Sequence, residues 1–283
     1  DVYKRQDRTT LTGHGAWDLT SSGHTGFPIE RGFRIEGDAN FRGVGQSISG
    51  GFDLNDDGFD DFLIGVETDS KNGHVDDVGE AVLVYGTNEF DRSILPLQNL
   101  AGKGGSMNPR GVILALKNKD GAGKKALLGL EMAALDDVNG DGHDDIAVGA
   151  PQYGDGGAAF VIFGGIQYHG TLFLDEMDGS DGFGILGAKK GDLCGGDVKK
   201  AGDFNGDGYG DIIVGAAGFE HRRGAAYIVL GRKHFGPTVR ADISFRGDVA
   251  KDMAGYSVSS AGDVDGDGPV SYTHLTLPTS YPV

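Results

Sequence analysis

The stretch DVNGDGHDDIAVGAP, Asp137–Pro151, sets four carboxylates and one Asn within nine residues and then changes to an alternating apolar run. Carboxylates packed this closely repel one another unless a positive charge lies among them. The spacing of the oxygen-bearing side chains, together with the strand-like run behind them, therefore bears on both the fold and a bound cation.

The same motif returns along the chain in a constant frame. Its first Asp stands at Asp53, Asp137, Asp203 and Asp263, at spacings of 84, 66 and 60 residues. One Gly stands 16 positions before each of these Asp residues, a second Gly eight positions before, and an apolar residue five positions before. These positions are Gly37, Gly121, Gly187 and Gly247; Gly45, Gly129, Gly195 and Gly255; and Ile48, Met132, Val198 and Val258. So many matches in one frame indicate an internal repeat.

Each repeat is expected to form four short strands. A first strand precedes the acidic loop, a second apolar run follows it, and a third run ends at Gly86, Gly164 or Gly231. The second and third runs are apolar on both faces, which is typical of strands covered on both sides. We expect the fourth strand in the runs SILPLQNL (93–100), TLFLDEM (171–177) and TVRADISF (238–245). Four short strands per unit of about 60 residues predict an all-β fold, a β-propeller with one blade per repeat.

The three complete acidic loops, at 53–61, 137–145 and 203–211, carry oxygen-bearing side chains at positions 1, 3, 5 and 9 and a turn-forming Gly at position 6. The candidate metal ligands are Asp53, Asn55, Asp57 and Asp61; Asp137, Asn139, Asp141 and Asp145; and Asp203, Asn205, Asp207 and Asp211. The backbone carbonyl at position 7, which belongs to Phe59, His143 or Tyr209, can join them while its side chain varies freely. Hard oxygen ligands indicate Ca²⁺ rather than Zn²⁺ or copper, and Mg²⁺ would take fewer carboxylates and more water.

An EF-hand shares positions 1, 3, 5 and 6 with these loops, but it needs a Glu at position 12 and a helix on each side. Position 12 is here Ile64, Val148 or Val214, within a predicted strand, so the EF-hand interpretation fails. A fourth loop, at 263–267, keeps Asp263, Asp265 and Asp267 but has Pro269 and Ser271 at positions 7 and 9. We expect weak or absent metal binding there.

The sequence resembles FG-GAP repeats, which form the blades of the integrin α-subunit propeller and of many bacterial secreted and surface proteins. The Gly of the "FG" pair falls at the four positions eight residues before the loops, and "GAP" is complete at 149–151 and partial at 215–217. The resemblance covers roughly residues 30–268. It implies a ring of seven blades, of which about four are present, with structural Ca²⁺ in loops on one face and partners on the opposite face.

The net charge and the apolar runs of the chain exclude some classes of binding partner. The net charge is −17 and the pI about 4.7, so a nucleic acid or an anionic membrane surface would repel the chain. No apolar run reaches the roughly 20 residues of a membrane-spanning helix. Residues 1–6 and 270–283 do not fit the repeat, and we expect them to be adaptor-derived, which leaves 7–269 as a single FG-GAP propeller region with no observable signal peptide.

Together these features predict an extracellular or cell-surface, calcium-binding propeller that binds a protein or glycan ligand in adhesion. No GxSxG or HExxH motif occurs, so we expect a binding module rather than an enzyme. Two alternatives stay open: an ancillary propeller of a secreted hydrolase or phospholipase-like enzyme, and a purely structural repeat array.

Overall fold

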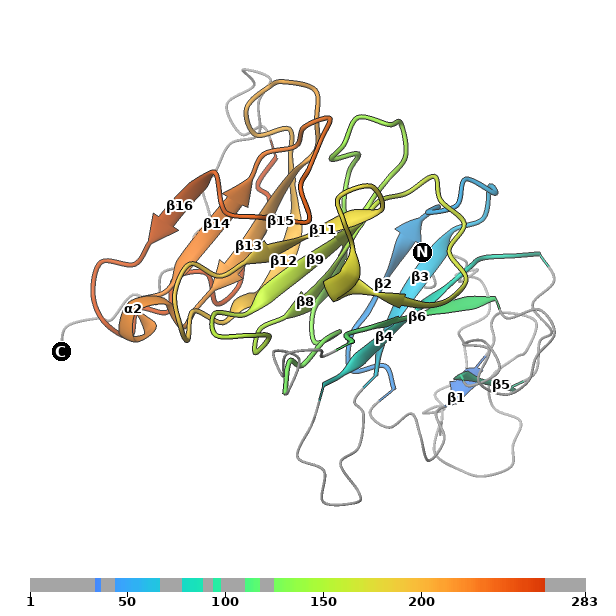
Figure 1. Cartoon of the computed structure of the whole chain (residues 1–283), viewed down its shortest axis with the longest axis horizontal. Helices are drawn as coiled ribbons and strands as arrows, with labels where there is room; N and C mark the ends of the chain where they lie inside the picture. The colour runs from blue at the N-terminus through green and yellow to red at the C-terminus, as the bar shows by residue number, and fades with distance from the viewer. Residues whose placement is uncertain are drawn as a thin grey trace, which may run out of the picture.

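The structure, a computed structural model, describes residues 34–36, 44–66, 78–88, 94–97, 110–117 and 125–262. The predicted fourth loop and the expected adaptor-derived ends lie outside these residues. The regular secondary structure of the described part is almost entirely β-strand and is arranged in several sheets, as the predicted propeller requires (Figure 1). Its helical segments are short, and no helix among the described residues has the length and apolar character needed to cross a membrane.

Three sheets follow one another along the chain, one for each complete repeat. Each contains four antiparallel strands, and the first two sheets carry a fifth, parallel strand at one edge. The first contains β2 (Ile48–Phe52), β3 (Asp61–Val66), β4 (Glu80–Val84) and β6 (Gly111–Ala115). The second contains β7 (Met132–Ala134), β8 (Ile146–Ala150), β9 (Ala158–Ile162) and β11 (Gly182–Leu186). The third contains β12 (Cys194–Gly202), β13 (Asp211–Ala216), β14 (Ala225–Val229) and β16 (Ile243–Arg246). These are three blades of a β-propeller.

The fourth strands do not all lie where the sequence pattern places them, and this is a correction. SILPLQNL contributes β5 (Ile94–Pro96), which pairs in parallel with β1 (Arg34–Glu36). TLFLDEM contributes the end of β10 (Gly170–Phe173), parallel to β6, and then a 3-10 turn, η2 (Leu174–Glu176). Of TVRADISF, β15 (Thr238–Val239) pairs in parallel with β11, and only the remainder enters the fourth strand β16. In the second and third blades, the connection to the fourth strand thus first adds an edge strand to the preceding sheet.

The hydrophobic core lies between the blades. Every residue of β8, β9, β13 and β14 is buried, which confirms that the second and third strands are covered on both faces. One cluster joins the first and second blades through residues such as Leu83, Val148 and Phe160. Another joins the second and third blades through Val161, Val214 and Tyr227. Stacking of neighbouring blades is therefore what buries the apolar surface.

The repeated Gly residues stand where backbones of neighbouring blades meet. A Cβ added to Gly149, at the end of β8, would come closer than 3.0 Å to the carbonyl oxygen of Gly195 in the next blade. Gly65 and Gly129 are related in the same way one blade earlier. Gly195 itself has φ +86° and lies against the backbone of Ala158. The "FG" and "GAP" glycines therefore form one feature, a close backbone approach that excludes any side chain.

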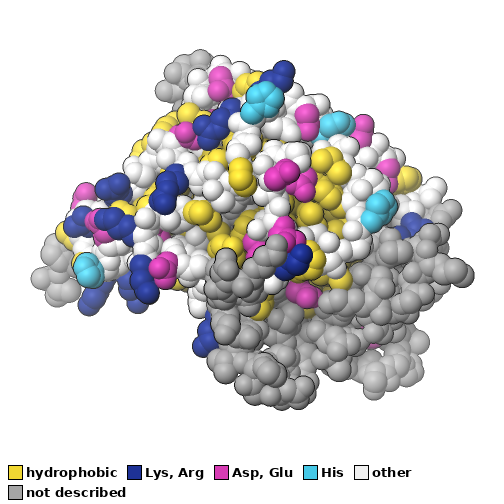
Figure 2. All heavy atoms as spheres, in the orientation of Figure 1, with side chains coloured by type: hydrophobic (Ala, Val, Ile, Leu, Met, Phe, Trp, Pro, Cys, Tyr) yellow, Lys and Arg dark blue, Asp and Glu magenta, His cyan; other side chains and the backbone are white. Residues whose placement is uncertain are grey.

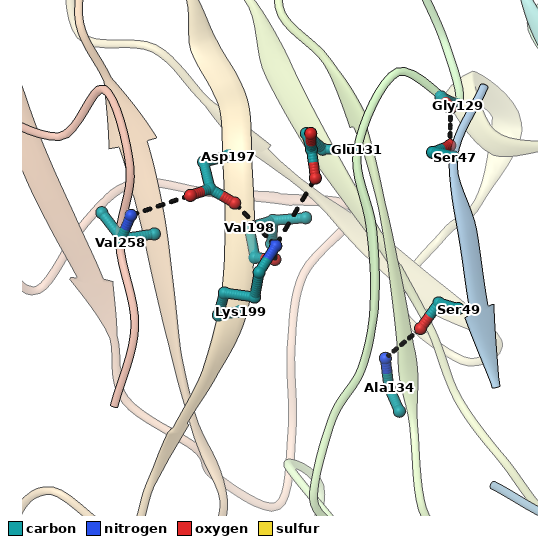
Figure 3. A network of polar contacts seen from close by, with 9 residues as sticks. All are labelled: Ser47, Ser49, Gly129, Glu131, Ala134, Asp197, Val198, Lys199 and Val258. Atoms are coloured by element: carbon teal, nitrogen blue, oxygen red, sulfur yellow. Dashed lines mark hydrogen bonds and ion pairs between the residues drawn. The ribbon is translucent and has the colours of Figure 1, made fainter. Parts of the chain in front are cut away.

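Polar contacts also join the first strands of successive blades (Figure 3). Ser47 Oγ donates to the carbonyl of Gly129 at 2.5 Å, and Ser49 Oγ accepts from Ala134 N at 3.2 Å. Lys199 Nζ pairs with Asp197 at 2.7 Å and lies 3.5 Å from Glu131 of the preceding blade. These contacts lie on one edge of each sheet, so the blades are aligned there by polar groups as well as by the apolar clusters.

Replacement of Gly149 by Ala should destabilise the fold, because the added methyl group has to push two backbones apart. We expect the free energy of unfolding to fall by roughly 1–3 kcal/mol, as is typical of overpacking. Urea unfolding followed by circular dichroism measures this change. Gly236→Ala is the matched control, since a Cβ there meets nothing closer than 3.9 Å. Equal stability of the two variants would show that the blades do not approach as described.

Candidate metal centre

The three complete acidic loops occupy equivalent places in the fold. Each connects the first strand of a blade to the second, so the loops lie at the same end of three neighbouring sheets, along the upper side of Figure 1. The candidate ligands of one loop are therefore close to one another, and those of different loops form separate groups.

The carboxylate at position 1 closes each loop on its own backbone. Asp137 accepts hydrogen bonds from the N–H groups of Asp141 and Gly142, at positions 5 and 6. Asp53 and Asp203 do the same, and the six distances run from 2.7 to 3.1 Å. Gly142 has φ +94° with open space around it, so the left-handed turn rather than crowding selects Gly at position 6.

Positions 3, 5 and 7 continue this arrangement. Asp141 Oδ1 accepts from His143 N at 3.0 Å, and Asp141 Oδ2 accepts from Asn139 Nδ2 at 2.8 Å. In this loop and the third, the Asn carbonyl oxygen also accepts a backbone N–H. The first loop differs, because Asn55 Oδ1 is buried and has no hydrogen-bond partner. An acceptor oxygen in that state is costly unless a donor or a cation reaches it.

Position 9 has a role that the sequence pattern did not reveal. Asp145 is fully buried, and its two oxygens accept from Val138 N at 2.8 Å and from Gly164 N at 2.9 Å. Asp61 and Asp211 make the equivalent pair of bonds at 2.7–2.9 Å. Each carboxylate thus ties the acidic loop to the Gly that ends the third strand. The constant Gly at that strand end was the available signal.

Burial changes the acidity of these carboxylates. Burial raises the pKa of Asp61 to about 6 and that of Asp145 to about 7. It also raises the pKa of Asp211. The negative charges at positions 1 and 5 of each loop raise the pKa further, whereas the two backbone N–H bonds lower it. A positive charge in the loop would therefore favour the ionised form.

The side chains at position 7 pack against neighbouring segments. The Tyr209 ring lies against Gly140 of the preceding acidic loop, and the His143 ring lies against Gly165. Backbone bonds of 2.7 Å from Gly210 N to Asp137 O and from Gly165 N to Leu54 O join successive blades at the same level. The type of side chain at position 7 therefore follows local packing.

Within the described ranges, no three His, Cys, Asp or Glu side chains converge closely enough to hold a metal ion as they stand. The loop carboxylates face backbone N–H groups instead. The predicted ligand sets of the three loops stay predictions, and Asp263, Asp265 and Asp267 lie beyond the described residues.

The family model of the FG-GAP repeat matches residues 129–162 and 201–229. Each match begins in or just before the first strand of a blade and runs through the acidic loop to the third strand. The matches therefore cover the second and third blades, where the loops are most regular.

Curated relatives are integrin α chains. The chain is 36% identical over 148 residues to integrin alpha pat-2 of Caenorhabditis briggsae. The aligned region covers 48% of this chain and 12% of the relative. It is 33% identical over 162 residues to integrin alpha-6 of Gallus gallus (52% and 13%) and 30% identical over 184 residues to integrin alpha-5 of Xenopus laevis (62% and 15%). The matched region thus spans about an eighth of the length of each relative.

The two matches of the family model coincide with the second and third repeats of the sequence frame. These three relatives come from animals. The chain therefore contains FG-GAP repeats at 129–162 and 201–229, and it is similar over about half of its length to integrin α chains.

Proposed function

We propose that this chain is part of an extracellular, calcium-stabilised β-propeller that acts as a non-enzymatic binding module in adhesion. The observation that carries the proposal is the set of three equivalent loops, each rich in oxygen ligands, at one end of three stacked blades. The similarity to integrin α chains supports a place outside the cell or on its surface. The ligand would be a protein or a glycan, held by loops on a rigid scaffold.

The donor set of the loops fits Ca²⁺. In each loop the carboxylates of positions 1, 5 and 9, the amide oxygen of position 3 and the carbonyl of position 7 would hold the ion. Their oxygens are hard ligands, and Asn55 Oδ1 has no other partner. Bound Ca²⁺ would supply two positive charges to each loop and thus relieve the repulsion among its carboxylates.

The loop residues would use this ion to fix the blade rather than to perform chemistry. Asp145 already connects the loop to the end of the third strand through Gly164. Ligation at positions 1 and 9 would add a link between the end of the first strand and the start of the second. A propeller with these links offers a rigid opposite face for a partner.

Calcium should raise the melting temperature of the chain, and Mg²⁺ should do so much less. Sites of the extracellular kind bind with Kd of roughly 10⁻⁴–10⁻³ M. At ten times Kd each site stabilises the fold by about 1.4 kcal/mol. Thermal melts in excess chelator, in Ca²⁺ and in Mg²⁺ measure the effect. A cooperative melt that is the same in all three conditions contradicts calcium binding.

Asp141→Ala and Asp207→Ala should each remove part of the calcium-induced shift, because each loses a ligand of one loop. Asp144→Ala is the matched control, since Asp144 is exposed, lies in the same loop and carries the same charge at position 8. If Asp144→Ala lowers the shift as much as Asp141→Ala does, the effect of calcium is general screening rather than ligation.

In chelator, the chain should become more stable as the pH is lowered from about 8 to about 6. The pKa of folded Asp145, about 7, lies above the ordinary Asp value of about 3.9. Between these values the folded chain binds more protons than the unfolded chain, so stability falls as the pH rises.

Calcium should weaken this dependence on pH, because it favours the ionised carboxylate. Melting temperatures across this pH range, with and without Ca²⁺, measure both slopes. Asp145→Asn should flatten the slope in chelator, and Asp178→Asn, which changes an exposed carboxylate, should leave it unchanged. Equal slopes in the two variants would contradict the role given to Asp145.

A further inference from the structure

A basic surface lies around the short turn α2 (Phe219–Arg222), at the end of the blades opposite the acidic loops. The turn joins the second and third strands of its blade, whereas the acidic loop joins the first and second, so the two lie at opposite ends of one antiparallel sheet. Lys and Arg side chains gather over this corner, at the lower left of Figure 2. We call it the α2 surface and define it by Lys189, Arg222, Arg223 and Arg246.

The charge of this surface is opposite to that of the chain. The three segments that form it, 187–193, 217–224 and 246–253, contain six Lys or Arg and four Asp or Glu, whereas the whole chain has 25 and 42. Two of these four acids are turned to their own loops. Asp192 is fully buried and accepts from Lys189 N and Tyr227 Oη, and Asp252 accepts from Val249 N.

A buried aromatic ring holds two of the cations in place. Phe219 is 1% exposed. Lys189 Nζ lies 5.2 Å and the Arg246 guanidinium carbon 5.0 Å from the centre of its ring, within the range of cation–π attraction. Glu220 pairs with both Lys189 and Arg223. One carboxylate therefore lies among three cations, which leaves a local excess of positive charge.

The backbone of α2 is held in an uncommon conformation. Glu220, His221 and Arg222 have φ values of 42°, 62° and 65°, three successive left-handed residues without a Gly among them. Such a run costs energy and persists only where its surroundings enforce it. Here Met253 N and Ala254 N donate to the carbonyls of Arg222 and Arg223 at 2.9 and 3.1 Å, and these bonds anchor the turn to the following segment.

The guanidinium groups retain donors for a ligand. Arg222 contacts the thioether sulfur of Met253 at 3.5 Å, which is a weak acceptor. Arg246 is exposed, and its guanidinium lies over the face of the Phe219 ring. A planar guanidinium can bind a carboxylate with two parallel hydrogen bonds, so these groups suit a ligand that brings carboxylates to them.

We propose that the α2 surface binds an acidic peptide segment of a partner protein, through carboxylates that pair with Arg222, Arg246 and Lys189. The inference rests on the proposed binding function and names its site and the chemistry of its ligand. A peptide fits better than a long anionic glycan, because a polyanion that extends beyond this corner meets a chain of net charge −17.

The test is binding of a fluorescein-labelled peptide of alternating Glu and Ser to the full chain in calcium-containing buffer, followed by fluorescence anisotropy. A peptide of alternating Gln and Ser is the neutral control. We expect the acidic peptide to bind and the neutral peptide not to bind. Raising the ionic strength to ~0.15 M should weaken binding, because exposed charges are then screened over about 8 Å.

Arg222→Gln should weaken acidic peptide binding about tenfold, equivalent to about 1.4 kcal/mol. The matched control is Lys233→Gln, an exposed cation in the connection after β14, at the end that carries the acidic loops. It should change binding less than twofold. Melting temperatures of both variants, with and without Ca²⁺, establish that they are folded.

Three results would overturn the proposal: no binding of the acidic peptide, equal loss in Arg222→Gln and Lys233→Gln, or binding of a sulfated polysaccharide under conditions where the peptide does not bind. None of them affects the calcium melts, so a failure of the α2 surface is distinct from a failure of the calcium-stabilised propeller.

Discussion

The buried carboxylate at position 9 of the acidic loop is the contact on which each blade depends. Asp61, Asp145 and Asp211 join three pieces of chain that are far apart in the repeat: the start of the acidic loop, the second strand and the Gly that ends the third strand. A backbone N–H left unpaired in this interior would cost free energy, and each Asp satisfies two of them. The repulsion from the neighbouring carboxylates is then tolerable, because strong charge-assisted bonds offset it.

This contact explains why the chain is rich in both Asp and Gly: each buried Asp at position 9 bonds to a Gly at the end of the third strand. The Gly after the third strand, such as Gly164, allows no side chain because Asp144 O lies against its Cα. The Gly pair at 149 and 195 works in the same way between blades. Close backbone approach therefore recurs at both ends of the sheets. The repeat conserves its own frame because every blade has to satisfy both its internal carboxylate bonds and its fit to the next blade.

Much of this architecture could be predicted from the sequence. The constant frame of Asp and Gly residues predicted the repeat, the all-β fold and the positions of the first three strands, since strand periodicity and turn chemistry are local signals. The fourth strand was not predictable in that way. Leu172 and Ile185 lie in equally strand-like runs, and only tertiary pairing assigns Leu172 to the edge of the preceding blade and Ile185 to its own.

The candidate site, too, was predictable only where the signal is local in the sequence. The oxygen pattern of Asp137, Asn139, Asp141 and Asp145 identified the loops, but not the bonds from Asp145 to Val138 and Gly164. The bond to Val138 spans seven positions and the bond to Gly164 spans 19, across a sheet whose pairing the local pattern does not specify. The left-handed turn at 220–222 could not be predicted from the sequence either, because Glu and Arg rarely adopt positive φ and the turn contains no Gly or Asn. Its conformation follows from anchoring by Met253 and Ala254, which belong to the next repeat.

The blades are held together without covalent ties. Cys194 is buried and is the single Cys of the chain, so no internal disulfide can join one blade to another. In a stack of repeats, stability is approximately a sum of the stability of each unit and of each interface. Neighbouring units here share apolar clusters, paired glycines and the polar contacts of Ser47, Asp197 and Lys199. These contacts stabilise the interfaces between units. An ion held within each acidic loop would instead stabilise the single blade. Calcium and blade stacking are therefore complementary, because each ion would be held within a single loop whereas the apolar clusters join neighbouring blades.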